Sequence, residues 1–190
     1  MLQECISEMK VNNQKLYHNL LVTEKQPNLT QIMESQHYSS IQKLFGVTAY
    51  FLRFVNNLKN KIRNQPSDSP TTVTARAISS AESLWIQEAQ SQLVEDPNFA
   101  VLERQLWLFL DPSGVWRCGG RISNADLSYL AKHPVSLPRH HLLTMLIIKD
   151  AHEKVFHNGV KETLTEICFR FWILKGRSLV KSIIRQCTLY

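Results

Sequence analysis

The stretch HEKVFHNG at residues 152–159, together with Cys187 further along the chain, decides which fold this sequence can adopt. Four residues separate His152 from His157, and 29 residues separate His157 from Cys187. This spacing is typical of a two-histidine, two-cysteine zinc site, in which imidazole and thiolate groups surround the ion as a tetrahedron. The last position of the pattern holds Tyr190 instead of cysteine. Three of the four ligands are therefore present.

Apolar residues at steps of three and four predict three helices around these ligands. The first helix should carry His152 on its apolar face and end before His157, because five further helical residues would turn the second ring about 140° away. Asn158 and Gly159 supply the stop, since both tolerate the left-handed conformation that closes helices. The second helix should span about 160–170, and the third should start near Gly176. We expect these side chains to face inward: Leu142, Met145, Ile148, His152 and Val155, then Leu164, Ile167, Cys168 and Phe171, then Val180, Ile183, Ile184 and Cys187.

A resemblance to a known family is carried by the run KHPVSLPRHHLLTMLIIKDAHEKVFHNGVKETLTEICFRFWILKGRSLVKSIIRQC at 132–187. This run resembles the amino-terminal zinc-binding domain of retroelement integrases, closest to the BEL/Pao group of long-terminal-repeat retrotransposons. The resemblance extends over about residues 22–190. It also rests on three upstream segments: YSSIQKLFGVTAYFLRFVNNLK (38–59), ISSAESLWIQEAQ (78–90) and LDPSGVWRCGGRISNADL (110–127). In the polyproteins of the family, such segments join the reverse transcriptase and ribonuclease H region to integrase.

By this resemblance, the metal ligands are His152, His157 and Cys187, and the fourth family position falls on Tyr190. A phenol with a pKa of about 10 is a poor zinc ligand at pH 7. We therefore expect zinc to bind more weakly than at a complete site. A water molecule or the terminal carboxylate of Tyr190 would then take the fourth position.

Positive charge is concentrated at the carboxyl-terminal end of the chain. The sequence holds 22 Lys and Arg against 16 Asp and Glu, and no acidic residue follows Glu166. A surface of one sign suits a phosphate backbone, so we predict DNA binding without base specificity, directed to element ends by the resemblance. A basic face that is merely solvated is the alternative. The predicted contact residues are Lys175, Arg177, Lys181 and Arg185.

The upstream sequence predicts a mainly α chain with one small β-hairpin. Apolar residues keep helical spacing over Tyr38–Ile62, and their face should pack in a core, with a peptide groove or a membrane surface as alternatives. The sequence Ser79-Ser80-Ala81-Glu82 resembles a capping box that opens a second helix. We divide the chain into an amino-terminal segment with the long helix (1–63), a linker (64–78), a helix with a hairpin at 106–118 (79–132), and the zinc-binding-like domain (133–190).

Several classes of function are disfavoured by the composition. No apolar run approaches the roughly 20 residues of a membrane span. The four cysteines are widely spaced without a signal peptide, which favours an intracellular protein of the nucleus or cytoplasm. The acidic residues form no cluster able to hold the two metal ions of integrase or ribonuclease H chemistry, so we expect no enzyme and no small-molecule substrate.

Two functions follow as expectations. The first is the non-catalytic part of a retrotransposon integrase, a zinc-binding module that binds nucleic acid, associates with integrase and supports DNA integration. The second is a degenerate retroelement fragment or a domesticated helical adapter for protein contacts, with an impaired zinc site.

Overall fold

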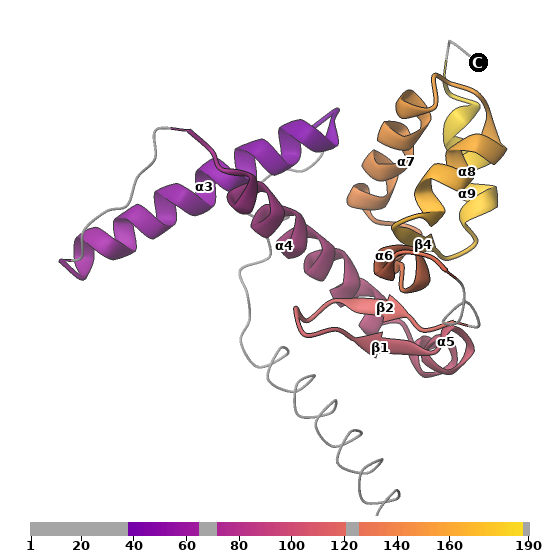
Figure 1. Cartoon of the computed structure of the whole chain (residues 1–190), viewed down its shortest axis with the longest axis horizontal. Helices are drawn as coiled ribbons and strands as arrows, with labels where there is room; N and C mark the ends of the chain where they lie inside the picture. The colour runs from indigo at the N-terminus through magenta and orange to yellow at the C-terminus, as the bar shows by residue number, and fades with distance from the viewer. Residues whose placement is uncertain (1–37, 65–71, 121–125, 188–190) are drawn as a thin grey trace, which may run out of the picture. The chain divides into compact units, whose positions relative to one another are not determined.

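The computed structural model describes residues 38–64, 72–120 and 126–187 (Figure 1). The expectations about residues 1–37, the middle of the linker and Tyr190 lie outside these ranges. The predicted fold class, mainly α with a small β element, is confirmed. The elements in chain order are α3 (Ile41–Ile62), α4 (Ala75–Val94), α5 (Phe99–Leu106), β1 (Leu108–Leu110), β2 (Trp116–Cys118), α6 (Tyr129–Lys132), β3 (Val135–Leu137), α7 (Leu142–Lys154), α8 (Val160–Cys168), β4 (Phe171–Ile173) and α9 (Gly176–Ile184).

Helix α3 is the predicted long amphipathic helix, but only its first half is buried. Its buried residues are Ile41, Leu44, Phe45, Thr48 and Ala49. The expectation that the whole apolar face packs in the core is wrong, because burial is confined to the first half of α3, where Thr48 contacts α4 and Gln42 contacts α7. In the second half, Phe54 is 59% exposed and Ile62 is 81% exposed.

Helix α4 begins five residues earlier than predicted, with Thr74 in place of Ser79 as its cap. The hydroxyl oxygen of Thr74 accepts a hydrogen bond from the Ala77 N–H and caps the helix, so Ser79 and Ser80 lie inside it. The predicted capping box is therefore wrong, because Thr74 supplies a cap upstream and residues 75–78 contain no helix breaker. On the buried side of α4, the Trp85 indole N–H donates to the Thr48 hydroxyl at 2.8 Å and joins α4 to α3.

The predicted hairpin is confirmed. Strands β1 and β2 pair antiparallel, with Leu110 opposite Trp116. The Asp111 carboxylate organises the turn, because it accepts hydrogen bonds from the Ser113 and Val115 N–H groups and pairs with Arg117 at 2.6 Å. Burial opposes ionisation of Asp111, but hydrogen bonds from the Ser113 hydroxyl, from Arg117 and from the Val115 N–H, together with the charge of Arg117, outweigh it and lower the pKa of the carboxyl.

The hairpin is half of a sheet that sequence patterns did not predict. Strand β3 pairs antiparallel with β2, and β4 pairs parallel with β3, in the order β1-β2-β3-β4. The second helix of the zinc module was expected to reach Arg170, but α8 ends at Cys168 and the chain turns into β4. Phe171 is buried as expected, although in a strand, whereas Cys168 is exposed.

A buried glutamine ties the sheet to α4. The Gln90 side-chain amide donates to the carbonyl oxygens of Trp116 and Ser136, and its oxygen accepts from the Trp116 N–H, each at 2.8 Å. Gln90 is only 2% exposed, so every one of these bonds is made away from water. Strands β2 and β3 are thereby fixed against one helix.

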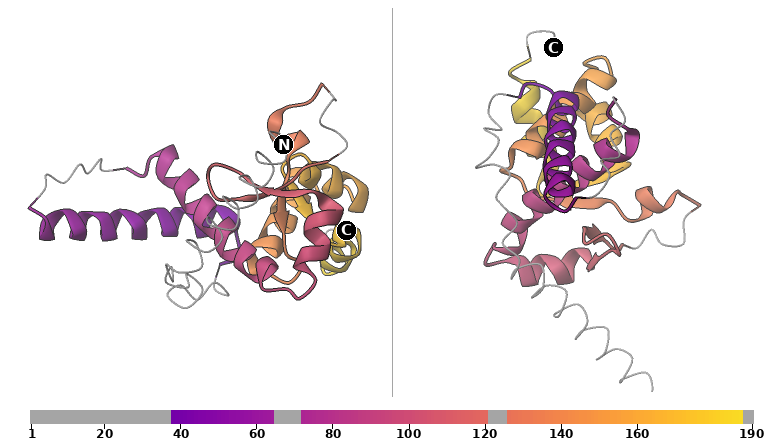
Figure 2. Two further views of the ribbon diagram at one scale, coloured as in Figure 1. Left: turned by 90° about the horizontal axis from the view of Figure 1, so that it is seen from below. Right: turned by 90° about the vertical axis from the view of Figure 1, so that its left-hand side faces the viewer.

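Helices α7, α8 and α9 contact one another in pairs and form the predicted three-helix arrangement (Figure 2). The buried side of α7 differs from the predicted stripe, because Met145 is 40% exposed while Leu143, Leu146 and Ile147 are buried. His141 caps α7 through its Nδ1, which accepts from the Leu143 N–H at 3.2 Å. None of the described helices combines the length and apolar character needed to cross a membrane.

Candidate metal centre

The last turn of α7 and the turn after it bring two imidazole rings together. His152 lies in the last turn of the helix, and the predicted end of the helix before His157 is confirmed. The left-handed residues that stop the helix are Phe156 and His157, with φ of 52° and 59°, ahead of Gly159 at 95°. The His157 N–H donates to the His152 carbonyl at 2.9 Å. This reversal places the two ring centroids 4.6 Å apart at 88°.

Cys187 reaches the same place from α9. The helix ends at Ile184, and the Cys187 N–H donates to the Ile184 carbonyl at 2.9 Å. Cys187 was expected to close the third helix, but it lies in the turn that follows. Its sulfur is 3.3 Å from Nδ1 of His157.

The three predicted ligands form one cluster. One donor atom from each of His152, His157 and Cys187 lies within 4.8 Å of the others. Zinc bonds of about 2.0 to 2.3 Å place tetrahedral ligand atoms roughly 3.3 to 3.7 Å apart. Small side-chain movements would therefore close these three groups around one ion. Tyr190 lies outside the described residues.

Thr163 of α8 orients the deeper imidazole. Its hydroxyl is fully buried and donates its only proton to the Gly159 carbonyl at 2.7 Å. The Thr163 oxygen can then only accept from Nδ1 of His152, which lies 3.2 Å away. The proton on Nδ1 leaves the lone pair of His152 on Nε2, the tautomer that a metal would need there. Thr163 was not predicted from the sequence, although it lies on the inward stripe of α8, one turn after Gly159.

The protonation state of His152 also suits a metal ligand. Burial lowers the pKa of His152, and the neighbouring His157 lowers it further, with Glu153 as a smaller opposing influence. A neutral ring carries the lone pair that binds zinc. Two imidazoles and a thiolate are a donor set that fits zinc. The buried hydroxyl of Thr163 orients one of these imidazoles, that of His152.

The four predicted DNA contacts lie in and next to α9. Lys175, Arg177, Lys181 and Arg185 are all exposed. The last three are spaced four residues apart and share one side of the helix. Arg139 was not predicted, but its guanidinium donates to the Ser178 hydroxyl at 2.9 Å and adds a cation beside α9.

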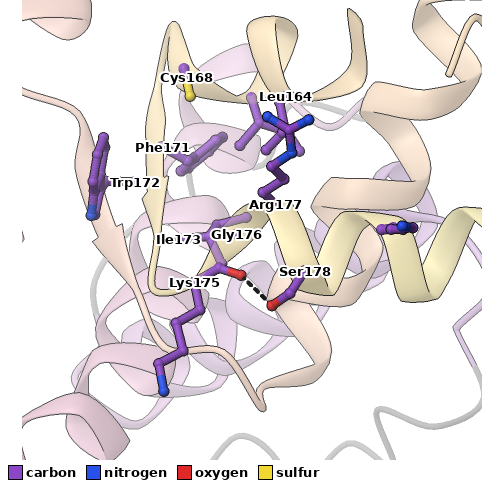
Figure 3. Close-up of a pocket in the computed structure, with 11 residues that line it drawn as sticks. Leu164, Cys168, Phe171, Trp172, Ile173, Lys175, Gly176, Arg177 and Ser178 are labelled. Carbon is purple, nitrogen blue, oxygen red and sulfur yellow. Dashed lines mark hydrogen bonds between the residues drawn. The ribbon is translucent and has the colours of Figure 1, made fainter. Parts of the chain in front are cut away.

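A groove of about 620 Å³ lies between α8, β4 and α9 (Figure 3). Leu164, Ile167 and Phe171 supply apolar lining, while Lys175, Arg177 and Lys181 supply the charge. The Ser178 hydroxyl donates to the Lys175 carbonyl at 2.9 Å and fixes the start of α9. No carboxylate is among the lining residues of this groove. The charged side chains of this groove are therefore all cations, set beside a lining that is mostly apolar.

Comparison with known families adds one finding. Residues 140–190 match the model of the integrase zinc binding domain. The matched stretch contains the His-His-Cys cluster and helices α7, α8 and α9. Searches of curated proteins and of solved structures find no match. The match supports an integrase-type zinc-binding domain at this end of the chain.

Proposed function

We propose that the chain is the non-catalytic part of an integrase of a BEL/Pao-type retrotransposon, and that its carboxyl-terminal module binds zinc and DNA. The observation that carries this proposal is the His152, His157 and Cys187 cluster, gathered inside the residues that match the family. Bound zinc would supply a cross-link between the end of α7 and the end of α9. With Tyr190 at the fourth position, binding should be weaker than at a complete site.

Zinc binding is tested by competition with a chromophoric chelator. The chain should bind one ion, and Cys187→Ser should abolish that binding. Cys168→Ser is the matched control, because Cys168 is a free, exposed cysteine outside the cluster. His140→Ala is the corresponding control for substitution of the cluster histidines His152 and His157, because His140 is exposed and lies outside the cluster. Undiminished zinc binding by Cys187→Ser would remove the ligand assignment.

DNA binding is proposed to rest on the exposed cations of α9. Arg177→Glu together with Lys181→Glu should abolish binding to a fluorescent duplex at low salt. For the unaltered chain, log K should fall linearly with log salt, with a slope of about 0.9 for each phosphate contact. Lys43→Glu together with Arg76→Glu makes the same change in net charge elsewhere and should have little effect. An equal loss of DNA affinity in both double variants would mean that net charge, and not the position of the cations on α9, determines binding.

The proposal gives this chain no catalytic step. It supports integrase assembly on element DNA, and that role places it in the nucleus or cytoplasm. A purified chain should show no strand-transfer or ribonuclease H activity with Mg²⁺ or Mn²⁺. The second candidate, a domesticated adapter with an impaired zinc site, is favoured by the exposed apolar residues of α3. It predicts failure of both binding assays above.

A further inference from the structure

The second half of α3 carries a row of exposed large apolar side chains, which we call the α3 stripe: Tyr50, Phe54, Leu58 and Ile62. Their exposures are 58%, 59%, 45% and 81%. The residues are four apart, so they follow one side of the helix. Phe51 and Val55 lie beside them and are half-buried. Single exposed apolar residues are ordinary, but a contiguous row of this kind marks an interaction surface.

We infer that the α3 stripe binds the α3 stripe of a second copy of this chain, with the two helices antiparallel. The stripe is complementary to itself in that orientation. A twofold axis near Asn56 places Tyr50 opposite Ile62 and Phe54 opposite Leu58. Each aromatic ring then meets an aliphatic side chain, and the same patch serves both copies, as in most homodimers.

The charges of α3 favour the antiparallel orientation over the parallel one. Lys59, Lys61 and Arg63 gather at the end of the helix, and α3 contains no acidic residue. Parallel helices would bring both sets of cations together. Antiparallel helices separate them by about 10 residues, roughly 15 Å along the axis, which exceeds the Debye length of about 8 Å at physiological salt.

Two symmetry-related pairs of cations lie opposite each other in this register. Arg53 lies opposite Lys59 of the second copy. At 100° per residue, both positions lie about 120° away from the centre of the stripe. Both cations therefore lie outside the contact between the two copies.

The covered half of α3 is compatible with the same register. Residues 41–49 of one copy, which α4 and α7 cover, would lie at or beyond the end of the partner's helix, since residue 49 falls opposite residue 63. The helices therefore meet only over residues 50–62. Neither copy has to displace its own α4 to form the pair.

The size of the stripe sets the strength of the dimer. Aromatic side chains bury about 150–250 Å² each when fully covered, so two aromatic and two aliphatic side chains that are about half exposed contribute on the order of 400 Å² per copy. Stable interfaces bury about 800 Å² per partner. The dimer should consequently be weak, with dissociation in the micromolar range, and its population should rise with protein concentration.

The inference rests on the assembly role proposed above, and its experiment measures neither zinc nor DNA. Sedimentation equilibrium of the full chain should show a monomer–dimer equilibrium. Phe54→Glu together with Leu58→Glu should leave a monomer at every concentration, with an unchanged circular dichroism spectrum. Val101→Glu is the matched control, because Val101 of α5 is 44% exposed, close to the 45% of Leu58, and lies outside the stripe. This variant should still dimerise.

Orientation is tested by mixing a Phe54→Cys chain with a Leu58→Cys chain under mild oxidation. The mixed disulfide should form faster than either homodimeric disulfide, whereas parallel helices would favour the homodimeric products. The inference is overturned by a monomeric full chain, by a dimer that survives the double glutamate change, or by stripe-dependent binding of a monomer to phosphatidylserine vesicles. If zinc and DNA binding persist in these cases, only this inference fails and the proposed function stands.

Discussion

The core around α4 and the cluster at the end of α9 both bury polar atoms, but they satisfy them differently. Gln90 makes three hydrogen bonds to two strands, and Trp85 donates to Thr48, so the first region is complete with groups from the chain itself. At the second, a sulfur and imidazole nitrogens converge with their lone pairs. Lone pairs on neighbouring atoms repel one another, and a cation placed between them removes that repulsion. We therefore predict that the region around α4 is stable without a metal, whereas the region around α9 is stabilised by a bound ion.

Removal of zinc should have the largest effect on stability, and this effect should be confined to the zinc-binding region and leave the α4 region unchanged. Complete structural zinc sites contribute on the order of 10 kcal/mol or more, and we expect several kcal/mol from this three-ligand site. Hydrogen exchange of the zinc-loaded chain before and after chelation measures this locally. Amides of α9 should lose protection while those of α4 keep theirs. Equal loss in both helices would show that the regions are one cooperative unit.

Trp85→Ala should produce the complementary result. The Trp85 side chain is fully buried between α4 and α3, and its truncation should cost about 3–5 kcal/mol of unfolding free energy. Urea denaturation with and without zinc measures this loss. The loss of unfolding free energy measured with zinc and the loss measured without zinc should be similar in size. A loss that disappears when zinc is present would contradict the separation of the α4 region from the zinc-binding region.

Thr163→Val should weaken zinc binding without disturbing the helix. The change keeps the shape of the side chain but removes the oxygen that accepts from His152, and loss of such a supporting contact typically lowers metal affinity by about 10–100-fold. Thr165→Val is the control on the same helix, since Thr165 makes the equivalent bond to the carbonyl four residues back and is exposed. Equal affinities in the two variants would remove the orienting role of Thr163.

The smallest expected effect is on how the stability of the fold depends on pH. Burial lowers the pKa of His141, so the unfolded chain binds a proton at this position more tightly than the folded chain does. This contribution to stability is full above a pH of about 6.5 and is lost as the pH falls below it. His141→Asn keeps a capping acceptor and should reduce the loss between pH 7 and pH 5. His140→Asn, at the exposed neighbouring position, should leave the acid dependence unchanged.

Local patterns in the sequence predicted the three helices of the zinc module and the residues of the cluster. The spacing of apolar residues predicted that His152 faces inward, that the helix ends before His157 and that Cys187 faces the two histidines. The same patterns could not predict β3 and β4, because three-residue strands are too short to show alternation and their pairing joins distant residues. Nor could they identify Thr163 or Gln90, since the partners of a buried polar group depend on tertiary packing.

Helix α3 shows a related limit of sequence patterns. Its apolar spacing continues unchanged from Ile41 to Ile62, whereas its burial ends near Ala49. Periodicity identifies which side of a helix is apolar, but the length of the neighbouring helices decides how much of that side they cover.

The pairing of β3 with β4 determines where this chain can be truncated. The family match begins at residue 140, but the Val135 N–H donates to the Arg170 carbonyl and Val135, Ser136 and Leu137 lie opposite Phe171, Trp172 and Ile173. A fragment that starts at residue 140 would leave the backbone of β4 without its neighbouring strand, and an unpaired edge next to apolar side chains promotes aggregation. An expression fragment for spectroscopy or crystallisation should therefore start upstream of Val135, and one that also includes α4 would retain Gln90 as the support of that strand.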